Sequence, residues 1–137
     1  MLPTLCACTK LRRSARAVTA FYDAALEGSG LTTPQFSLLR LLARAGPSSL
    51  SAFAAQTGHD RTTISRTVGA LRDQGLVQSA EGPDQRAHMV ALSPAGRAAI
   101  ARSIPAWEAA EARVDAALGG DRTTLFALLD RIEGMAA

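Results

Sequence analysis

The sequence predicts a mostly α-helical fold with a small β-wing, because three features follow one another in its middle third. A helical segment ends at Gly58, a polar-faced helical segment begins after Asp60, and two short apolar strands then enclose Gly82-Pro83-Asp84. A helix, a turn, a second helix and a hairpin in this order are typical of a winged helix-turn-helix. We expect residues 31–92 to form this unit.

The chain up to Gly58 is expected to form three helices. Residues 4–27 predict the first helix, because apolar residues recur there every three or four positions. This apolar stripe consists of Cys8, Leu11, Ala15, Val18 and Tyr22. Thr33 followed by Pro34 predicts the cap and first residue of the second helix, and Gly46-Pro47 ends it. The second helix should bury Phe36, Leu39 and Leu42. The third should start among Ser48, Ser49 and Ser51.

The segment after Gly58 carries the signals of a fourth helix and a hairpin. Asp60 should cap this helix by accepting a hydrogen bond from the Thr63 amide, and Gly75 should terminate it. Residues 76–80 and 87–92 then predict the two strands of the hairpin, since turn-forming residues lie between them.

Two further helices are expected at the C-terminal end. Ser93-Pro94 should open a fifth helix with a kink at Pro105, and Asp121 should cap a sixth. The apolar positions of the sixth helix are Leu125, Leu128, Leu129 and Ile132. The small winged unit cannot cover the apolar stripes of the terminal helices. We therefore expect residues 1–30 and 93–137 to form a helical dimerisation region, intertwined with residues 31–92 and with a second copy of the chain.

Length and composition set broad limits on the class of protein. The 137 residues, 47% of them hydrophobic, are typical of one globular domain. The formal net charge of +3 permits nucleic-acid binding without arguing for it. All but one of the 15 basic residues are arginines, which suits phosphate and guanine recognition but also fits a genomic codon bias. No apolar run approaches the ~18 residues of a membrane span, so we expect no membrane partner. Two cysteines only two positions apart cannot staple a fold, so we expect a reducing, cytoplasmic location.

The fourth helix has the composition of a DNA-recognition helix. Ile64, Val68 and Leu71 share one face, and short hydroxyl side chains and an arginine occupy the opposite one. Hydroxyls bond phosphates or base edges, and arginine suits guanine. The residues that we expect to contact DNA from this helix are Arg61, Thr62, Thr63, Ser65 and Arg66. The alternative is an ordinary solvated amphipathic helix, which usually carries more Glu and Lys.

The hairpin provides a second candidate contact with DNA. Arg86 follows the hairpin tip and could enter a narrow minor groove, where the electrostatic potential is most negative. Asp84 would repel phosphate if it were free, so we expect it to pair with Arg86 and fix its direction. The alternative is an ordinary surface ion pair worth ~0 to 1 kcal/mol.

Several of these segments together resemble the MarR (multiple antibiotic resistance regulator) family over nearly the whole chain. The matching segments are Leu31-Thr32-Thr33-Pro34-Gln35-Phe36, Ser49-Leu50-Ser51, residues 60–66, Gly75-Leu76-Val77, Asp84-Gln85-Arg86 and residues 92–97. The resemblance implies a cytoplasmic homodimeric repressor or activator that binds a pseudo-palindromic, double-stranded DNA operator. It assigns base and phosphate contacts to Thr62, Ser65 and Arg66, and the wing arginine to Arg86. In this family a small ligand or an oxidant typically releases the DNA.

The resemblance also bears on how such a protein would be controlled. In the branch of the family that senses organic hydroperoxides, an Arg and a Tyr follow the reactive Cys at spacings that Cys8, Arg16 and Tyr22 reproduce. Thr33 stands where that branch has a second Tyr. The alternative is that Cys8 is a small apolar member of the helix stripe. We favour control by a small ligand, because Thr33 does not replace the missing Tyr.

A ligand of this kind would need a cleft, and the family geometry places one between the first, second and fifth helices. Arg16, Phe36, Arg40 and Trp107 are the candidate lining residues, and they would suit a small aromatic or anionic effector.

Other classes of function have weaker support in the sequence. Cys6 and Cys8 offer too few ligands for a zinc site, so we expect neither a metal nor a cofactor. No nucleophile–base–carboxylate set, phosphate-binding glycine loop or carboxylate pair indicates an enzyme. A winged helix that binds only protein remains an alternative, although the polar face of the fourth helix favours DNA.

Overall fold

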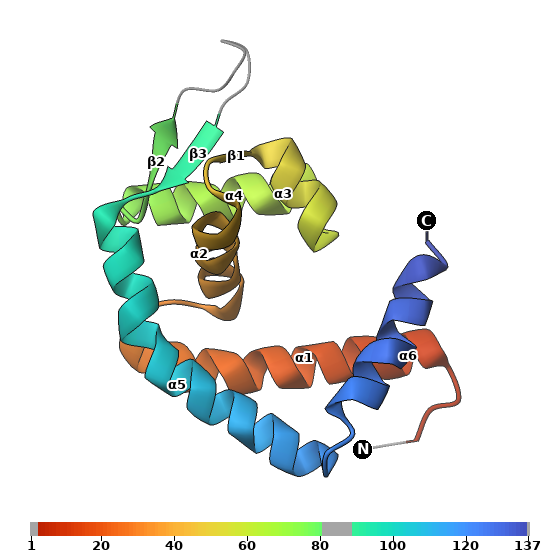
Figure 1. The fold of residues 1–137 in the computed structure, drawn as a ribbon. Helices are drawn as coiled ribbons and strands as arrows, with labels where there is room; N and C mark the ends of the chain where they lie inside the picture. The colour runs from red at the N-terminus through yellow and green to blue at the C-terminus, as the bar shows by residue number, and fades with distance from the viewer. Residues whose placement is uncertain (1–2, 81–88, 137) are drawn as a thin grey trace.

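The computed structural model describes residues 3–80 and 89–136, and it confirms a mostly helical winged helix-turn-helix. The elements are shown in Figure 1. In chain order they are α1 (Ala7–Leu26), the 3-10 turn η1 (Glu27–Ser29), α2 (Thr33–Ala45), β1 (Ser48–Ser49), α3 (Leu50–Thr57), α4 (Arg61–Asp73), β2 (Val77–Ala80), β3 (Met89–Leu92), α5 (Pro94–Leu118) and α6 (Arg122–Gly134).

The sheet has one strand more than the sequence predicts. Strands β2 and β3 pair antiparallel, with Ala80 opposite Met89, as expected of the hairpin. The strand β1 adds to the other edge of β3, with Ser48 opposite Val90, so the order is β1-β3-β2. Ser48 and Ser49, the second of which caps α3, carry no period-two apolar pattern. The two-stranded prediction was therefore wrong at this edge.

The hydrophobic core lies where α2, α3, α4 and the sheet meet. Phe53, Leu39 and Leu71 are fully buried there, and Val90 reaches the same core from β3. The predicted inward faces of α2 and α4 are confirmed, since Phe36, Leu42, Ile64 and Val68 are buried as well. This core fixes the rotation of α4 about its own axis and thereby decides which of its side chains face solvent.

The helix caps agree with the sequence in part. Ser49 and Ser93 cap α3 and α5 with their hydroxyls, as expected. The cap of α2 is Thr32, one residue before the predicted one, and its hydroxyl accepts from the Gln35 amide. Asp121 precedes α6 but makes no side-chain cap, because its backbone (ψ 16°) is not extended as it is at the capped ends. The prediction was wrong at these last two positions.

The helices from the two chain ends lie beside the core rather than within it. The long helices α1 and α5 pack on each other and on α2. Figure 1 shows α5 changing direction along its length, and the helix continues through Pro105. The helix α6 contributes no buried residue, and Phe126, Leu128 and Ile132 are about half exposed on it. Among the described helices, none is long and apolar enough to cross a membrane.

Candidate nucleic-acid interface

The turn between α3 and α4 is set by two residues that the sequence identified. Gly58 ends α3 in the left-handed conformation (φ 72°), which only glycine adopts at low cost. Asp60 caps α4, and its Oδ1 accepts from the Thr63 amide at 2.7 Å, as predicted. Hydrogen bonds from Thr63 hold the pKa of the Asp60 carboxyl below its usual value. The first turn of α4 is thereby fixed relative to α3.

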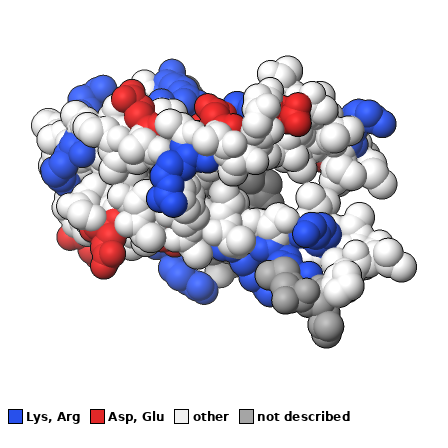
Figure 2. All heavy atoms as spheres, turned by 90° about the horizontal axis from the view of Figure 1, so that it is seen from below, with Lys and Arg blue, Asp and Glu red and all other residues white. Residues whose placement is uncertain are grey.

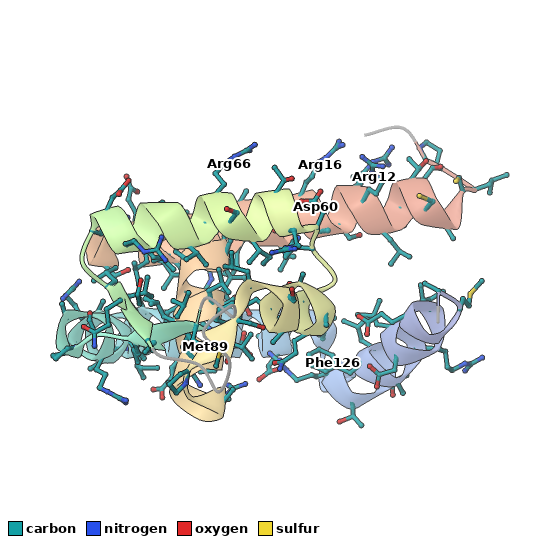
Figure 3. The ribbon with its side chains drawn as sticks, turned by 90° about the horizontal axis from the view of Figure 1, so that it is seen from above. Arg12, Arg16, Asp60, Arg66, Met89 and Phe126 are labelled. Atoms are coloured by element: carbon teal, nitrogen blue, oxygen red, sulfur yellow. The ribbon has the colours of Figure 1, made fainter. Side chains whose placement is uncertain are left out.

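The outer face of α4 brings four of the predicted DNA-contacting residues together. Arg61, Thr62, Ser65 and Arg66 line one shallow depression of about 470 Å³ with Leu50 at the start of α3. All four are exposed, and Figure 3 shows Arg66 pointing away from the body of the molecule. A depression with two guanidinium groups and two hydroxyls matches the donor chemistry that phosphates and base edges require.

The other predicted DNA-contacting residues do not belong to this group. Thr63 lines a separate cavity of about 390 Å³ between α1, α2 and α4, with Thr19 and His59 among its walls. Asp84 and Arg86 lie outside the described residues, so their roles stay predictions.

The predicted effector residues from α2 and α5 form a cluster of an arginine and two aromatic rings. The guanidinium carbon of Arg40 lies 4.7 Å from the ring centroid of Trp107 and 5.5 Å from that of Phe36. These residues line a cavity of about 190 Å³ together with Ser37 and Arg44. Phe36 and Trp107 also line an adjoining cavity of about 300 Å³ that reaches α1. Arg16 is not among the residues that line either cavity.

A polar network that the sequence analysis missed lies at the far end of the larger cavity. The hydroxyl of Tyr22 donates to Glu111, which lines the same cavity. Arg122 of α6 pairs with Glu111 at 2.8 Å and with Asp115 at 2.5 Å. Burial, together with the Glu111 carboxylate, raises the pKa of Tyr22 to about 12. Glu111 lies four residues after Trp107 on α5, so the helical spacing was the available signal.

The two cysteines lie at the start of α1, and both are exposed. Cys6 is the extended residue before the helix, whereas Cys8 lies in its first turn. The two thiols are therefore not related by helical spacing, because Cys6 lies outside the helix. Hydrogen bonds from Thr9 lower the pKa of the Cys6 thiol. The Thr33 hydroxyl donates to Asp23 at 2.7 Å, so it is already engaged. No group of three metal-ligating side chains occurs in residues 3–80 and 89–136.

Comparisons with known proteins agree with this geometry. A model of the MarR family matches residues 29–87. The uncharacterized HTH-type transcriptional regulator YwoH of Bacillus subtilis (strain 168) is 30% identical over 84 residues, which span 61% of this chain and 61% of that protein.

Solved structures extend the likeness to nearly the whole chain. The transcriptional regulator MosR of M. tuberculosis in complex with DNA is 36% identical, with a TM-score of 0.82 over 96% of this chain and 99% of that one. Bordetella bronchiseptica BpsR, whose DNA binding is regulated by 6-hydroxynicotinic acid, is 25% identical, with a TM-score of 0.83 over 97% of this chain and 96% of that one. The chain therefore belongs to the MarR family of DNA-binding transcriptional regulators.

Proposed function

We propose that this regulator is a repressor that binds a pseudo-palindromic operator as a homodimer and leaves it when a small ligand binds. The observation that carries the proposal is the exposed face of α4, where Arg61, Thr62, Ser65 and Arg66 lie together on a rigidly capped helix. The similarity to MosR, which was solved with DNA, supports it. The proposal places the protein in the cytoplasm, with the DNA that it binds.

The DNA-binding role is tested by replacing the arginine that projects from this face. Arg66→Ala should weaken operator binding by ~1 to 3 kcal/mol and relax the preference at one base position per half-site. The measurement is a fluorescence-anisotropy titration of wild type and variant with operator and scrambled duplexes. Equal losses on both duplexes would show that α4 does not recognise sequence.

The homodimer is proposed to form through residues 1–30 and 93–137, which leaves residues 31–92 to bind DNA. Phe126, Leu128 and Ile132 are exposed on α6, and Val18 is exposed on α1. An interface of this kind should bury ~2,000 Å² or more. Sedimentation equilibrium at micromolar protein should give twice 14.3 kDa, and a monomer would contradict the dimer and the two-half-site operator.

The ligand site is proposed to be the pair of cavities around Trp107. The Nη1 atom of Arg40 is buried there and has no hydrogen-bond partner among the described residues. A buried donor of this kind favours a ligand with an acceptor or an anionic group, and the rings of Phe36 and Trp107 favour a planar one. Trp107 is the sole tryptophan of the chain, so its fluorescence reports on this site.

The corresponding titration uses 6-hydroxynicotinate as the probe and its neutral amide as the control. The acid should change Trp107 fluorescence and weaken operator binding. Arg40→Gln should abolish both effects while leaving operator affinity without the probe unchanged. A fluorescence response that is equal for the acid and the amide would argue against an anion contact by Arg40.

Control by an oxidant is a second candidate, and the lowered pKa of the exposed Cys6 thiol favours it. A Cys6 or Cys8 thiolate would attack a hydroperoxide, breaking its O–O bond to give a sulfenic acid and an alcohol. Condensation with the other thiol would then form a disulfide and release water. The test is operator affinity with and without cumene hydroperoxide for wild type, Cys6→Ser and Cys8→Ser. Release that also survives in the double variant Cys6→Ser/Cys8→Ser would exclude these thiols.

A further inference from the structure

We propose that the face of α1 that carries Arg12 and Arg16 is a second DNA-contacting surface, which binds phosphates of the operator between its two half-sites. The inference rests on the proposed function, since it takes α4 to be seated in the major groove. It adds a separate surface from a different helix. The role of that surface is to bind the DNA backbone rather than to recognise base sequence.

Helix geometry places these two arginines on one exposed face. Arg12 and Arg16 are four residues apart in α1, and Thr19 follows within the next turn on the same side. All three are exposed. At ~100° per residue Arg12 and Arg16 lie ~100° and ~140° around the helix from Leu11, and the nearest member of the apolar stripe is Cys8, ~40° from Arg12. A dimer that buries Leu11 and Val18 therefore leaves the Arg12–Arg16 face available.

Thr19 shows which way this face is directed. It lines the cavity of about 390 Å³ to which His59 and Thr63 of the helix-turn-helix also contribute. The face of α1 that carries Thr19 is therefore turned toward the first turn of α4. Arg16 lies three residues earlier on that face, or ~4.5 Å along the helix axis. Figure 3 shows Arg12, Arg16 and Arg66 projecting to the same side of the molecule.

The arrangement of the elements places this face next to the path of the DNA. In Figure 1, α4 lies between the β2–β3 hairpin and α1. A duplex that follows α4 with the hairpin along one flank therefore passes α1 on the other flank. Because α1 also carries part of the proposed dimer interface, that flank faces the centre of the operator. The two copies of α1 would then lie over the phosphates between the half-sites.

The charge of this region fits a polyanion. The helix α1 contains no acidic residue before Asp23. Figure 2 shows Lys and Arg side chains toward the lower right of the view, where no Asp or Glu is visible among them. Within the described part of the chain, neither Arg12 nor Arg16 forms an ion pair. Arginines without a carboxylate partner can release counterions from DNA at no cost in broken ion pairs.

The experiment is the salt dependence of operator binding for wild type and for Arg12→Gln/Arg16→Gln. Each lost phosphate contact should reduce the magnitude of the slope of log affinity against log salt concentration by ~0.9. Two arginines in each of two protomers make four contacts, so the slope of the double variant should be smaller in magnitude by up to ~3.6. The loss should be the same on scrambled duplex, because phosphate contacts carry no sequence information. The lysine variant Arg12→Lys/Arg16→Lys should restore most of the slope.

Lys10→Gln is the matched control, since it removes one charge from α1 but on the side ~160° away from Arg12. A slope that falls equally for Lys10→Gln and Arg12→Gln would overturn the proposal, because only overall charge would matter. An unchanged slope in the double glutamine variant, or a loss that lysine does not restore, would also overturn it. If wild type binds no duplex, the proposed function fails instead, so the two failures are distinguishable.

Discussion

Replacing Gly96 with alanine sets two physical effects against each other, and the structure decides which one dominates. Gly96 lies in the first turn of α5, where alanine would favour the helix by up to ~1 kcal/mol. A Cβ atom at this position, however, would lie 2.1 Å from the Leu76 carbonyl oxygen and 2.8 Å from a methyl carbon of Leu92. The carbonyl is backbone, so it cannot turn aside as the end of a side chain could.

The hydrogen bonds around Gly96 make this backbone difficult to move. The Leu76 oxygen accepts from the Ser93 amide at 3.1 Å. The Ser93 hydroxyl donates to the Gly75 oxygen at 2.6 Å and accepts from the Gly96 amide at 3.0 Å. Relief of the clash would therefore disturb the cap of α5 and the end of α4 together. Overpacking of this kind costs ~1 to 3 kcal/mol or more, which exceeds the gain in helix propensity.

The expected result is a lower melting temperature for Gly96→Ala, by ~4 to 8 °C. The matched control is Gly69→Ala in α4, because a Cβ atom there would meet nothing within 4 Å. That substitution should raise the melting temperature by ~2 to 4 °C. Both are measured by thermal denaturation at one protein concentration, since the proposed dimer would melt in a concentration-dependent way. If Gly96→Ala is as stable as Gly69→Ala, the packing argument is wrong.

Three other predictions concern the polar groups. Asp60→Ala should lower the melting temperature at neutral pH. The difference in melting temperature between wild type and variant should shrink as the pH falls through the lowered pKa of the Asp60 carboxyl, because protonation removes the contribution of the carboxylate. Thermal denaturation at a series of pH values measures this. Tyr22 is the sole tyrosine, so its absorbance titration should have a midpoint near 12, and Glu111→Gln should move that midpoint downward. Arg122→Ala removes the ion pairs with Glu111 and Asp115, so hydrogen exchange should accelerate in α6 and not in α2–α4.

The local features of this fold could be predicted from the sequence. The buried face of α4 follows from the spacing of Ile64, Val68 and Leu71, and the caps at Asp60 and Ser93 follow from short polar side chains before a helix. These features depend on residues within one or two turns. Helical spacing alone also predicts which residues share the outer face of α4, namely Arg61, Thr62, Ser65 and Arg66.

The features that could not be predicted depend on distant parts of the chain. The strand at Ser48–Ser49 exists because β3 offers it a free edge, and nothing in the two serines indicates this. The contact between Tyr22 and Glu111 joins residues 89 positions apart. Thr63 also lines the cavity toward α1, which its position on α4 alone does not indicate, and its contact with DNA stays a prediction.

The most direct test of the central claim is selection of binding sites from a random duplex library by the wild-type protein. Wild type should enrich a pseudo-palindromic motif with half-sites ~10 base pairs apart, centre to centre, or a multiple of that distance. Arg66→Ala should lose preference at symmetry-related positions of the same motif. Failure to enrich any sequence, or enrichment of a single half-site without symmetry, would contradict the claim that this chain recognises DNA as a dimer through α4.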